Sequence, residues 1–248
     1  MLRMPEPDQN TLARRKDIIA AMRDIIPSPG GVIVDDDQLR PYECDGLMAY
    51  RQLPMIVVLP ENTAQVAAIL KYCHTHKIRV VPRGAGTGLS GGALPMADAI
   101  TISMMKFNRV LEIDWDNRAA VVQPGVTNLG ITRAVEHEGF YYAPDPSSQI
   151  ACSIGGNIAE NSGGVHCLKY GLTVHNLLSV EVVTAEGERV TIGSNGYDSC
   201  GMDLLALVTG SEGLLGIVTE VQVKLLPKPE VAQVVMAGFD SVQKAGDA

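Results

Sequence analysis

The chain carries the glycine-rich stretch Pro82-Arg83-Gly84-Ala85-Gly86-Thr87-Gly88-Leu89-Ser90-Gly91-Gly92, in which five of eleven residues are glycine. Glycine loses more conformational freedom on folding than any other residue and adds no side chain to a core, so another interaction has to hold this stretch in one shape. Backbone N–H groups without neighbouring Cβ atoms can donate several hydrogen bonds to one phosphate group. The stretch therefore predicts a loop that cradles a diphosphate.

The flanking residues argue against the two best-known phosphate loops. Residues 86–91 satisfy G-x-G-x-x-G, and Glu112 and Asp114 follow about 20 residues later, as in a Rossmann fold. That fold needs a helix to begin at the last glycines, whereas here Pro95 follows and residues 99–103 predict a strand. A P-loop is excluded because no Gly-Lys-Ser/Thr follows. A glycine-rich turn without any ligand stays open as the alternative.

Three more stretches follow in order: Ala143-Pro144-Asp145-Pro146-Ser147-Ser148, then Ser153-Ile154-Gly155-Gly156-Asn157 through Gly171, then Gly210-Ser211-Glu212-Gly213-Leu214-Leu215-Gly216-Ile217. Together with residues 83–92 they resemble the vanillyl-alcohol-oxidase (PCMH-type) flavoproteins. More narrowly, they are similar to the flavin subunit of glycolate oxidase and to D-lactate and D-2-hydroxyglutarate dehydrogenases. The four ordered matches span roughly residues 50 to 229 and are more specific than one glycine loop.

The resemblance implies an α+β fold, the PCMH-type FAD-binding fold of two α/β lobes. It divides the chain into an N-terminal helix and lead-in (1–50), the FAD-binding PCMH-type domain (51–229), and the start of a C-terminal substrate domain (230–248) that is missing or truncated here. No chemistry is assigned to the turn-rich segment 32–51.

The resemblance also implies that FAD is bound non-covalently by residues of all four stretches. Members that link the flavin through the glycine-rich loop use a histidine, and the matching position here is Thr87. The implied FAD-binding residues are Pro82, Arg83, Gly84, Ala85, Gly86, Thr87, Gly88, Leu89, Ser90, Pro144, Asp145, Ser148, Gly155, Gly156, Ala159, Asn161, Gly163, Glu212, Gly216, Ile217 and Val218.

Hydrophobic periodicity predicts a series of helices and strands. Asn128 is expected to cap a helix over residues 129–138, and Gly139 is expected to end that helix. A strand, helix and strand leading into Pro82 predict a βαβ unit. The predicted helices are residues 11–25, 129–138 and 202–208, one that follows Thr63 with Val66, Ile69, Leu70 and Cys73 on one face, and one that starts at Ser241. The predicted strands are 55–59, 78–81, 99–103, 110–113, 119–123, 177–184, 189–192, 217–225 and 231–238.

Composition limits the possible functions. The 248 residues, 46% hydrophobic, indicate a globular chain, and the net charge of −8 with scattered Lys and Arg argues against nucleic acid. No apolar run approaches membrane-spanning length and the first ten residues lack a signal-peptide core, so we expect a cytoplasmic protein. Five cysteines without a C-x-x-C pair argue against a disulfide framework and against an iron–sulfur cluster in this chain. His74 and His76, two apart on a helix, diverge, so no metal site is predicted.

The resemblance implies an FAD-linked oxidoreductase that oxidises a 2-hydroxy acid of the glycolate or D-lactate type. Hydride passes from the α-carbon to flavin N5, and the electrons go to a separate acceptor, by resemblance an iron–sulfur partner subunit. In the family the catalytic groups lie largely beyond residue 229, so no catalytic residue is assigned; His166 and His175 are the histidines nearest the flavin motifs. Two alternatives stay open: a non-catalytic binding or assembly module, and a nucleotide-sugar reductase of the same fold.

Overall fold

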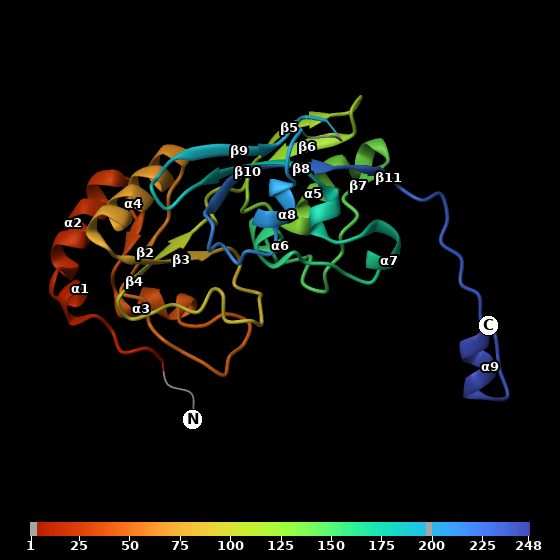
Figure 1. Cartoon of the computed structure of the whole chain (residues 1–248), viewed down its shortest axis with the longest axis horizontal. Helices are drawn as coiled ribbons and strands as arrows, with labels where there is room; N and C mark the ends of the chain where they lie inside the picture. Colours follow the sequence, from red (N-terminus) through yellow and green to blue (C-terminus); the bar gives the residue numbers. More distant parts are fainter. Residues whose placement is uncertain (1–3, 197–199) are drawn as a thin grey trace.

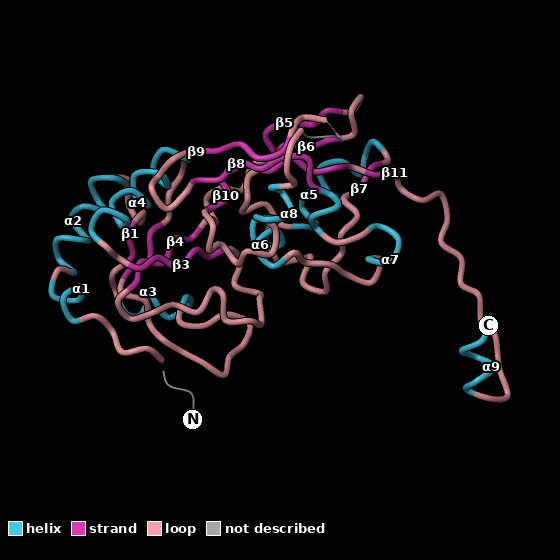
Figure 2. Tube along the Cα trace, viewed as in Figure 1, coloured by secondary structure: helices cyan, strands magenta, loops and turns pink. Residues whose placement is uncertain are grey.

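A computed structural model describes residues 4–196 and 200–248. In these residues the strands form two main sheets, each with its own hydrophobic core (Figures 1 and 2). A detached segment leaves the body after Lys228, whose N–H still donates to the carbonyl of Gly139, and ends in the short helix α9 (Val242–Asp247). The mixed α/β architecture agrees with the predicted fold class.

The first sheet has the order β1-β2-β4-β3, with β1 (Val32–Ile33), β2 (Ile56–Val58), β4 (Ala99–Ser103) and β3 (Arg79–Arg83). Strands β2, β4 and β3 are parallel, and β1 is antiparallel to β2. The predicted order of strand, helix and strand is confirmed by β2, α4 (Thr63–His76) and β3. However, β2 and β3 are not neighbours, because β4 lies between them.

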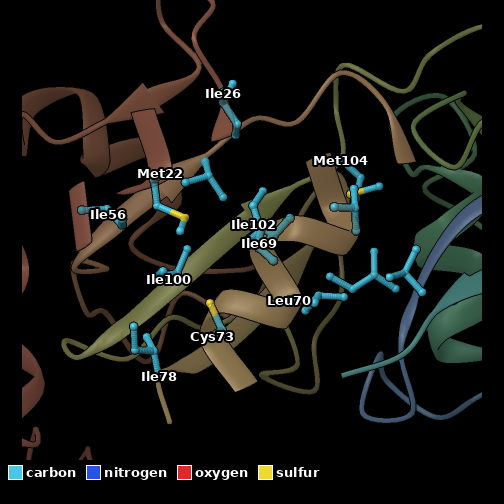
Figure 3. Packing of buried hydrophobic residues seen from close by; sticks show 14 of the residues in the cluster. Met22, Ile26, Ile56, Ile69, Leu70, Cys73, Ile78, Ile100, Ile102 and Met104 are labelled. Atoms are coloured by element: carbon cyan, nitrogen blue, oxygen red, sulfur yellow. The ribbon is translucent and has the colours of Figure 1, made fainter. Parts of the chain in front are cut away.

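Helices α2 (Arg15–Ile25) and α4 cover this sheet, and the short α1 (Gln9–Ala13) precedes α2. Ile69 and Cys73 of α4 lie beside Ile102 and Ile100 of β4 in Figure 3, and Leu70 belongs to the same core. The sequence predicted one helix over residues 11–25, whereas the structure has two, α1 and α2, with a break at Arg14.

The second sheet is antiparallel and has the order β5-β6-β10-β8-β9. Its strands are β5 (Val110–Asp114), β6 (Ala119–Val122), β10 (Ile217–Lys224), β8 (Leu177–Val183) and β9 (Arg189–Gly193). The predicted hairpin is confirmed by β8 and β9. Burial alternates along β10, as the sequence pattern predicts for a strand with one face on the core.

Three helices pack against the second sheet: α5 (Asn128–Val135), α6 (Ile154–Glu160) and α8 (Leu204–Val208). The prediction that Asn128 caps α5 is wrong. The cap is Thr127, whose Oγ1 accepts from the N–H of Gly130 at 3.1 Å. The buried Asn128 side chain instead donates to the carbonyl of Pro144 and to Oδ1 of Asn157, each at 3.0 Å, and so ties α5 to α6.

The remaining elements are short. The 3-10 helix η2 (Glu136–Glu138) continues α5 to Gly139, which has the predicted left-handed conformation with φ +78°. Strands β7 (Phe140–Tyr141) and β11 (Leu226–Pro227) pair in a small antiparallel sheet that the sequence analysis did not predict. The others are α3 (Asp36–Leu39), η1 (Arg40–Tyr42), α7 (Cys167–Tyr170) and η3 (Thr173–Asn176).

The strand predicted over residues 231–238 is wrong for this structure, which places no strand there. Val234 and Met236 are 96% and 95% exposed, so the segment has no described surface against which to pack. An isolated strand leaves its backbone groups and side chains in water and gains nothing from the alternating pattern. The helix predicted to start at Ser241 is confirmed by α9, and Ser241 Oγ accepts from the N–H of Lys244.

Candidate cofactor-binding site

A cleft of about 310 Å³ lies between the two sheets. Residues from β3 and the glycine-rich loop form one wall, and α6, the loop 211–216 and the start of β10 form the other. The glycine-rich loop leaves the carboxyl end of β3, and no described residue from 84 to 98 is helical. The structure therefore has the strand but not the helix that a Rossmann loop requires.

Most of the predicted FAD-binding residues line this cleft. They are Pro82, Arg83, Gly84, Ala85, Gly86, Thr87, Gly88, Leu89, Ser148, Gly155, Gly156, Ala159, Glu212, Gly216, Ile217 and Val218. Their predicted contact with FAD stays a prediction, but the fold brings these four distant stretches of sequence to one place.

Five predicted residues lie outside the lining: Ser90, Pro144, Asp145, Asn161 and Gly163. Three of these residues, Asn161, Gly163 and Asp145, make close contacts with other residues of the chain. Oδ1 of Asn161 accepts from the N–H of Val174 at 3.1 Å, and a Cβ on Gly163 would collide with Cys167. Asp145 pairs with His166.

Arg83 lines the cleft but its charge is directed into the protein. Its Nη1 donates to the carbonyls of Cys44 (2.8 Å) and Ala93 (3.2 Å), and its Nη2 to that of Pro41 (3.4 Å). The residue is 8% exposed, and burial lowers the pKa of its guanidinium, which still stays charged at neutral pH. Arg83 therefore ties the lead-in segment to the loop.

Replacement of Arg83 by methionine is expected to lower the free energy of unfolding by roughly 2–4 kcal/mol, because three carbonyls lose a charged donor. Urea unfolding followed by circular dichroism measures it. Arg40→Met is the matched control: Arg40 pairs with Asp37 on the surface, where such pairs contribute about 0–1 kcal/mol. Equal losses in both variants would contradict the anchoring role.

The segment 41–47 holds the glycine-rich loop in place, although the sequence pattern assigned it no chemistry. Buried Asp45 accepts from the N–H of Gly91 at 2.9 Å, and the N–H of Gly46 donates to the carbonyl of Gly88 at 2.9 Å. A Cβ on Gly46 would lie 2.8 Å from that carbonyl oxygen, so only glycine fits this approach. No periodic signal in the sequence could have revealed this long-range contact.

Helix α6 also approaches the loop closely. Ser153 caps it by accepting from the N–H of Gly156 at 3.2 Å. A Cβ on Gly84 would collide with Ser153 Oγ, and a Cβ on Gly155 would lie 2.7 Å from Pro124 Cβ. Packing within the chain therefore explains Gly84 and Gly155.

Gly88 is different, because packing within the chain does not require it. Its φ is not in the left-handed region, and a Cβ there would meet only the Glu160 carboxylate, with Oε1 at 3.6 Å. The space beside its backbone opens into the cleft. The backbone at Gly88 is therefore open to a close approach, as a diphosphate held by backbone N–H groups would require.

The loop 211–216 completes the site. The N–H of Gly210 donates to the carbonyl of Ile158 (2.7 Å), and that of Glu212 to the carbonyl of Ala159 (2.9 Å). Glu212 has the rare left-handed backbone conformation, with φ +54°. These bonds set its carboxylate beside that of Glu160 at the cleft.

The sequence prediction missed other residues of the lining: Asp45, Gly92, Ala93, Met104, Pro124, Cys152, Ser153, Asn157, Ile158, Glu160, Ser162, Val208, Ser211 and Gly213. Some adjoin predicted positions in the same motifs, and that adjacency was a usable signal. Asp45 and Met104 belong to no motif.

The two histidines nearest the flavin motifs do not line the cleft. His166 Nδ1 lies 2.6 Å from Asp145 Oδ2, and the Nδ1 of His175 accepts from the N–H of Leu172 at 3.1 Å.

None of the helices in the described part of the chain has the length and apolar content that a membrane-spanning helix requires.

Comparison with known proteins defines the class. The family model of the FAD binding domain matches residues 54–193, which include the glycine-rich loop and α6. The chain belongs to this FAD-binding family, and its cofactor is FAD.

The chain is similar to glycolate oxidase subunit GlcD of Escherichia coli (strain K12), with 60% identity over 94% of this chain and 46% of the relative. It is 38% identical to D-lactate dehydrogenase of Anaerostipes hadrus (82% of this chain, 43% of the relative) and 36% identical to mitochondrial D-2-hydroxyglutarate dehydrogenase of Bos taurus (90% and 41%). The chain spans about half the length of these relatives. A solved alkyldihydroxyacetonephosphate synthase shares the fold, with a TM-score of 0.72 at 22% identity, over 93% of this chain and 43% of that chain.

Proposed function

We propose that this chain provides the FAD site of an enzyme that oxidises a 2-hydroxy acid. One observation supports it most: the glycine-rich loop opens into a cleft, in a chain 60% identical to a glycolate oxidase subunit. The relatives named for glycolate, D-lactate and D-2-hydroxyglutarate share one substrate chemistry, a hydroxyl on the carbon next to a carboxylate.

The residues of the chain would then bind and orient the cofactor. Backbone N–H groups of Gly86 to Gly88 hold the diphosphate, and the apolar side chains of Met104 and Ile217 exclude water from the cleft. Bound FAD supplies the acceptor for the hydride from the substrate carbon. We assign no catalytic residue within this chain.

We propose the domain division 1–50, 51–229 and 230–248 on the same grounds. The exposed apolar side chains of Val231, Val234, Val235 and Met236 support a segment that packs against further structure.

We also propose a cytoplasmic protein that passes its electrons to an iron–sulfur partner subunit. The word "subunit" in the relative's name supports a complex of several chains.

Titration of the purified chain with FAD tests this assignment. Saturable binding with a change in flavin fluorescence supports the FAD site. A chain that remains colourless and takes up no FAD would favour a binding or assembly module that has kept only the fold.

Bound FAD is expected to be released by denaturation, because Thr87 offers only a hydroxyl, which is a poor nucleophile without an adjacent base. Acid precipitation should leave the yellow colour in the supernatant. Flavin that stays with the pellet, and with a peptide after proteolysis, would contradict a non-covalent site.

A further inference from the structure

Two glutamates face the glycine-rich loop across the cleft. A Cβ built on Gly92 would lie 3.4 Å from Glu160 Oε1 and 3.4 Å from Glu212 Oε2, and one on Gly88 would lie 3.6 Å from Glu160 Oε1. Both glutamates line the cleft. Two carboxylates therefore face the side of the backbone that is proposed to hold the diphosphate.

No Lys, Arg or His among the described lining residues pairs with either glutamate. Among the described residues that line the cleft, Arg83 is the only Lys, Arg or His, and its guanidinium donates to three carbonyls. Asp45 adds a third carboxylate, whose oxygens accept from the N–H groups of Gly91 and Leu47. The site thus has a surplus of negative charge where an anionic ligand is to bind.

Water moderates this surplus in the free protein, because Glu160 and Glu212 are exposed to the cleft. A bound dinucleotide displaces that water, and the repulsion between its phosphates and two ionised carboxylates then increases. Protonation of one carboxylate removes the repulsion and converts an acceptor into a donor.

We propose that Glu160 binds the diphosphate of FAD as a neutral carboxylic acid that donates a hydrogen bond, and that the site takes up about one proton from water when FAD binds. This inference rests on the proposed role of the glycine-rich loop. Glu160 is favoured over Glu212 because its carboxylate faces both Gly88 and Gly92, whereas that of Glu212 faces only Gly92. Partial burial of its carboxyl group is the main cause that raises the pKa of Glu160 in the free protein, and the charges of Glu212 and Asp45 raise it further.

The sign of the pH dependence follows. FAD raises the affinity of Glu160 for its proton, so the Kd of FAD is constant at pH values below the pKa of Glu160 in the free protein. Above it, the Kd rises by up to about tenfold per pH unit, and it levels off once Glu160 is ionised in the complex as well.

The experiment titrates the FAD-free chain with FAD at values from about pH 5 to about pH 9, with flavin fluorescence as the readout. Glu160→Gln mimics the neutral acid. Glu220→Gln is the matched control, because Glu220 lies on β10 outside the lining. The pKa of Glu220 is raised as well, mainly by burial and also by the charge of Glu181. Calorimetry in two buffers of different ionisation enthalpy counts the protons taken up.

Wild type and Glu220→Gln are expected to bind FAD more weakly as pH rises and to take up about one proton. Glu160→Gln is expected to show a flat Kd, at least about tenfold lower than wild type at the alkaline end, and no uptake. Weaker binding by Glu160→Gln at every pH would overturn the proposal, because it would mean that an ionised Glu160 accepts from FAD hydroxyls. A pH-independent Kd in wild type overturns this inference alone, whereas no FAD binding at any pH overturns the loop assignment too.

Discussion

Replacement of Gly88 by valine is expected to raise the Kd of FAD by at least about 100-fold, equivalent to roughly 2.7 kcal/mol, while the chain still folds. The fold tolerates the change because the only atoms near a Cβ at this position belong to the exposed Glu160 side chain. Binding is lost because the new side chain occupies the space through which a phosphate reaches the backbone N–H groups. Each such bond to a charged group contributes about 1.5–3 kcal/mol. Flavin fluorescence measures the Kd, and circular dichroism checks the fold.

Gly238→Val is the control for this experiment. Gly238 lies in the exposed segment, no atom is within 4 Å of a Cβ built there, and its φ is ordinary. Gly86→Val is not an equivalent test, because Gly86 has φ +72° and a Cβ there would collide with the Arg83 guanidinium. A Kd for Gly88→Val within about tenfold of wild type, with the fold intact, would show that this loop does not hold the diphosphate.

The 248-residue chain with FAD bound is expected to leave its flavin oxidised when mixed without oxygen with glycolate, D-lactate or D-2-hydroxyglutarate. Oxidation requires the substrate carbon to be held against the flavin with water excluded, and such positioning contributes about 7–11 kcal/mol to lowering the barrier. Among the described residues that line the cleft, Arg83 is the only cation, and it is engaged by backbone carbonyls. The described lining therefore offers no free cationic side chain to pair with a substrate carboxylate. The decrease of the flavin absorption band measures reduction.

Dithionite provides the positive control, since it should bleach the same bound flavin. Bleaching by a 2-hydroxy acid at an ordinary enzymatic rate would contradict the prediction and would place catalytic groups within this chain. His166 would then be the first residue to replace, because its short contact with Asp145 resembles a base held by a carboxylate.

Local sequence patterns predicted most of the elements correctly, because their signals act over a few residues. The alternation along residues 217–225 was sufficient for β10, and Gly139 was sufficient for the end of η2, which continues α5. The prediction of a strand over residues 231–238 was wrong because a local pattern is not sufficient for a strand that has no neighbour. The same alternation stabilises a strand only where a sheet and a core are present to receive it.

The sequence by itself determined the glycine-rich loop, its position after a strand, the absence of a Rossmann helix and the family. Only the tertiary structure decided that β4 lies between β2 and β3, that the guanidinium of Arg83 binds backbone carbonyls, and that Asp45 and Glu160 line the cleft. The reason is distance along the chain. Glycine content and periodicity are properties of neighbouring residues, whereas Asp45, Gly91 and Glu160 are far apart in the sequence and come together only in the folded chain.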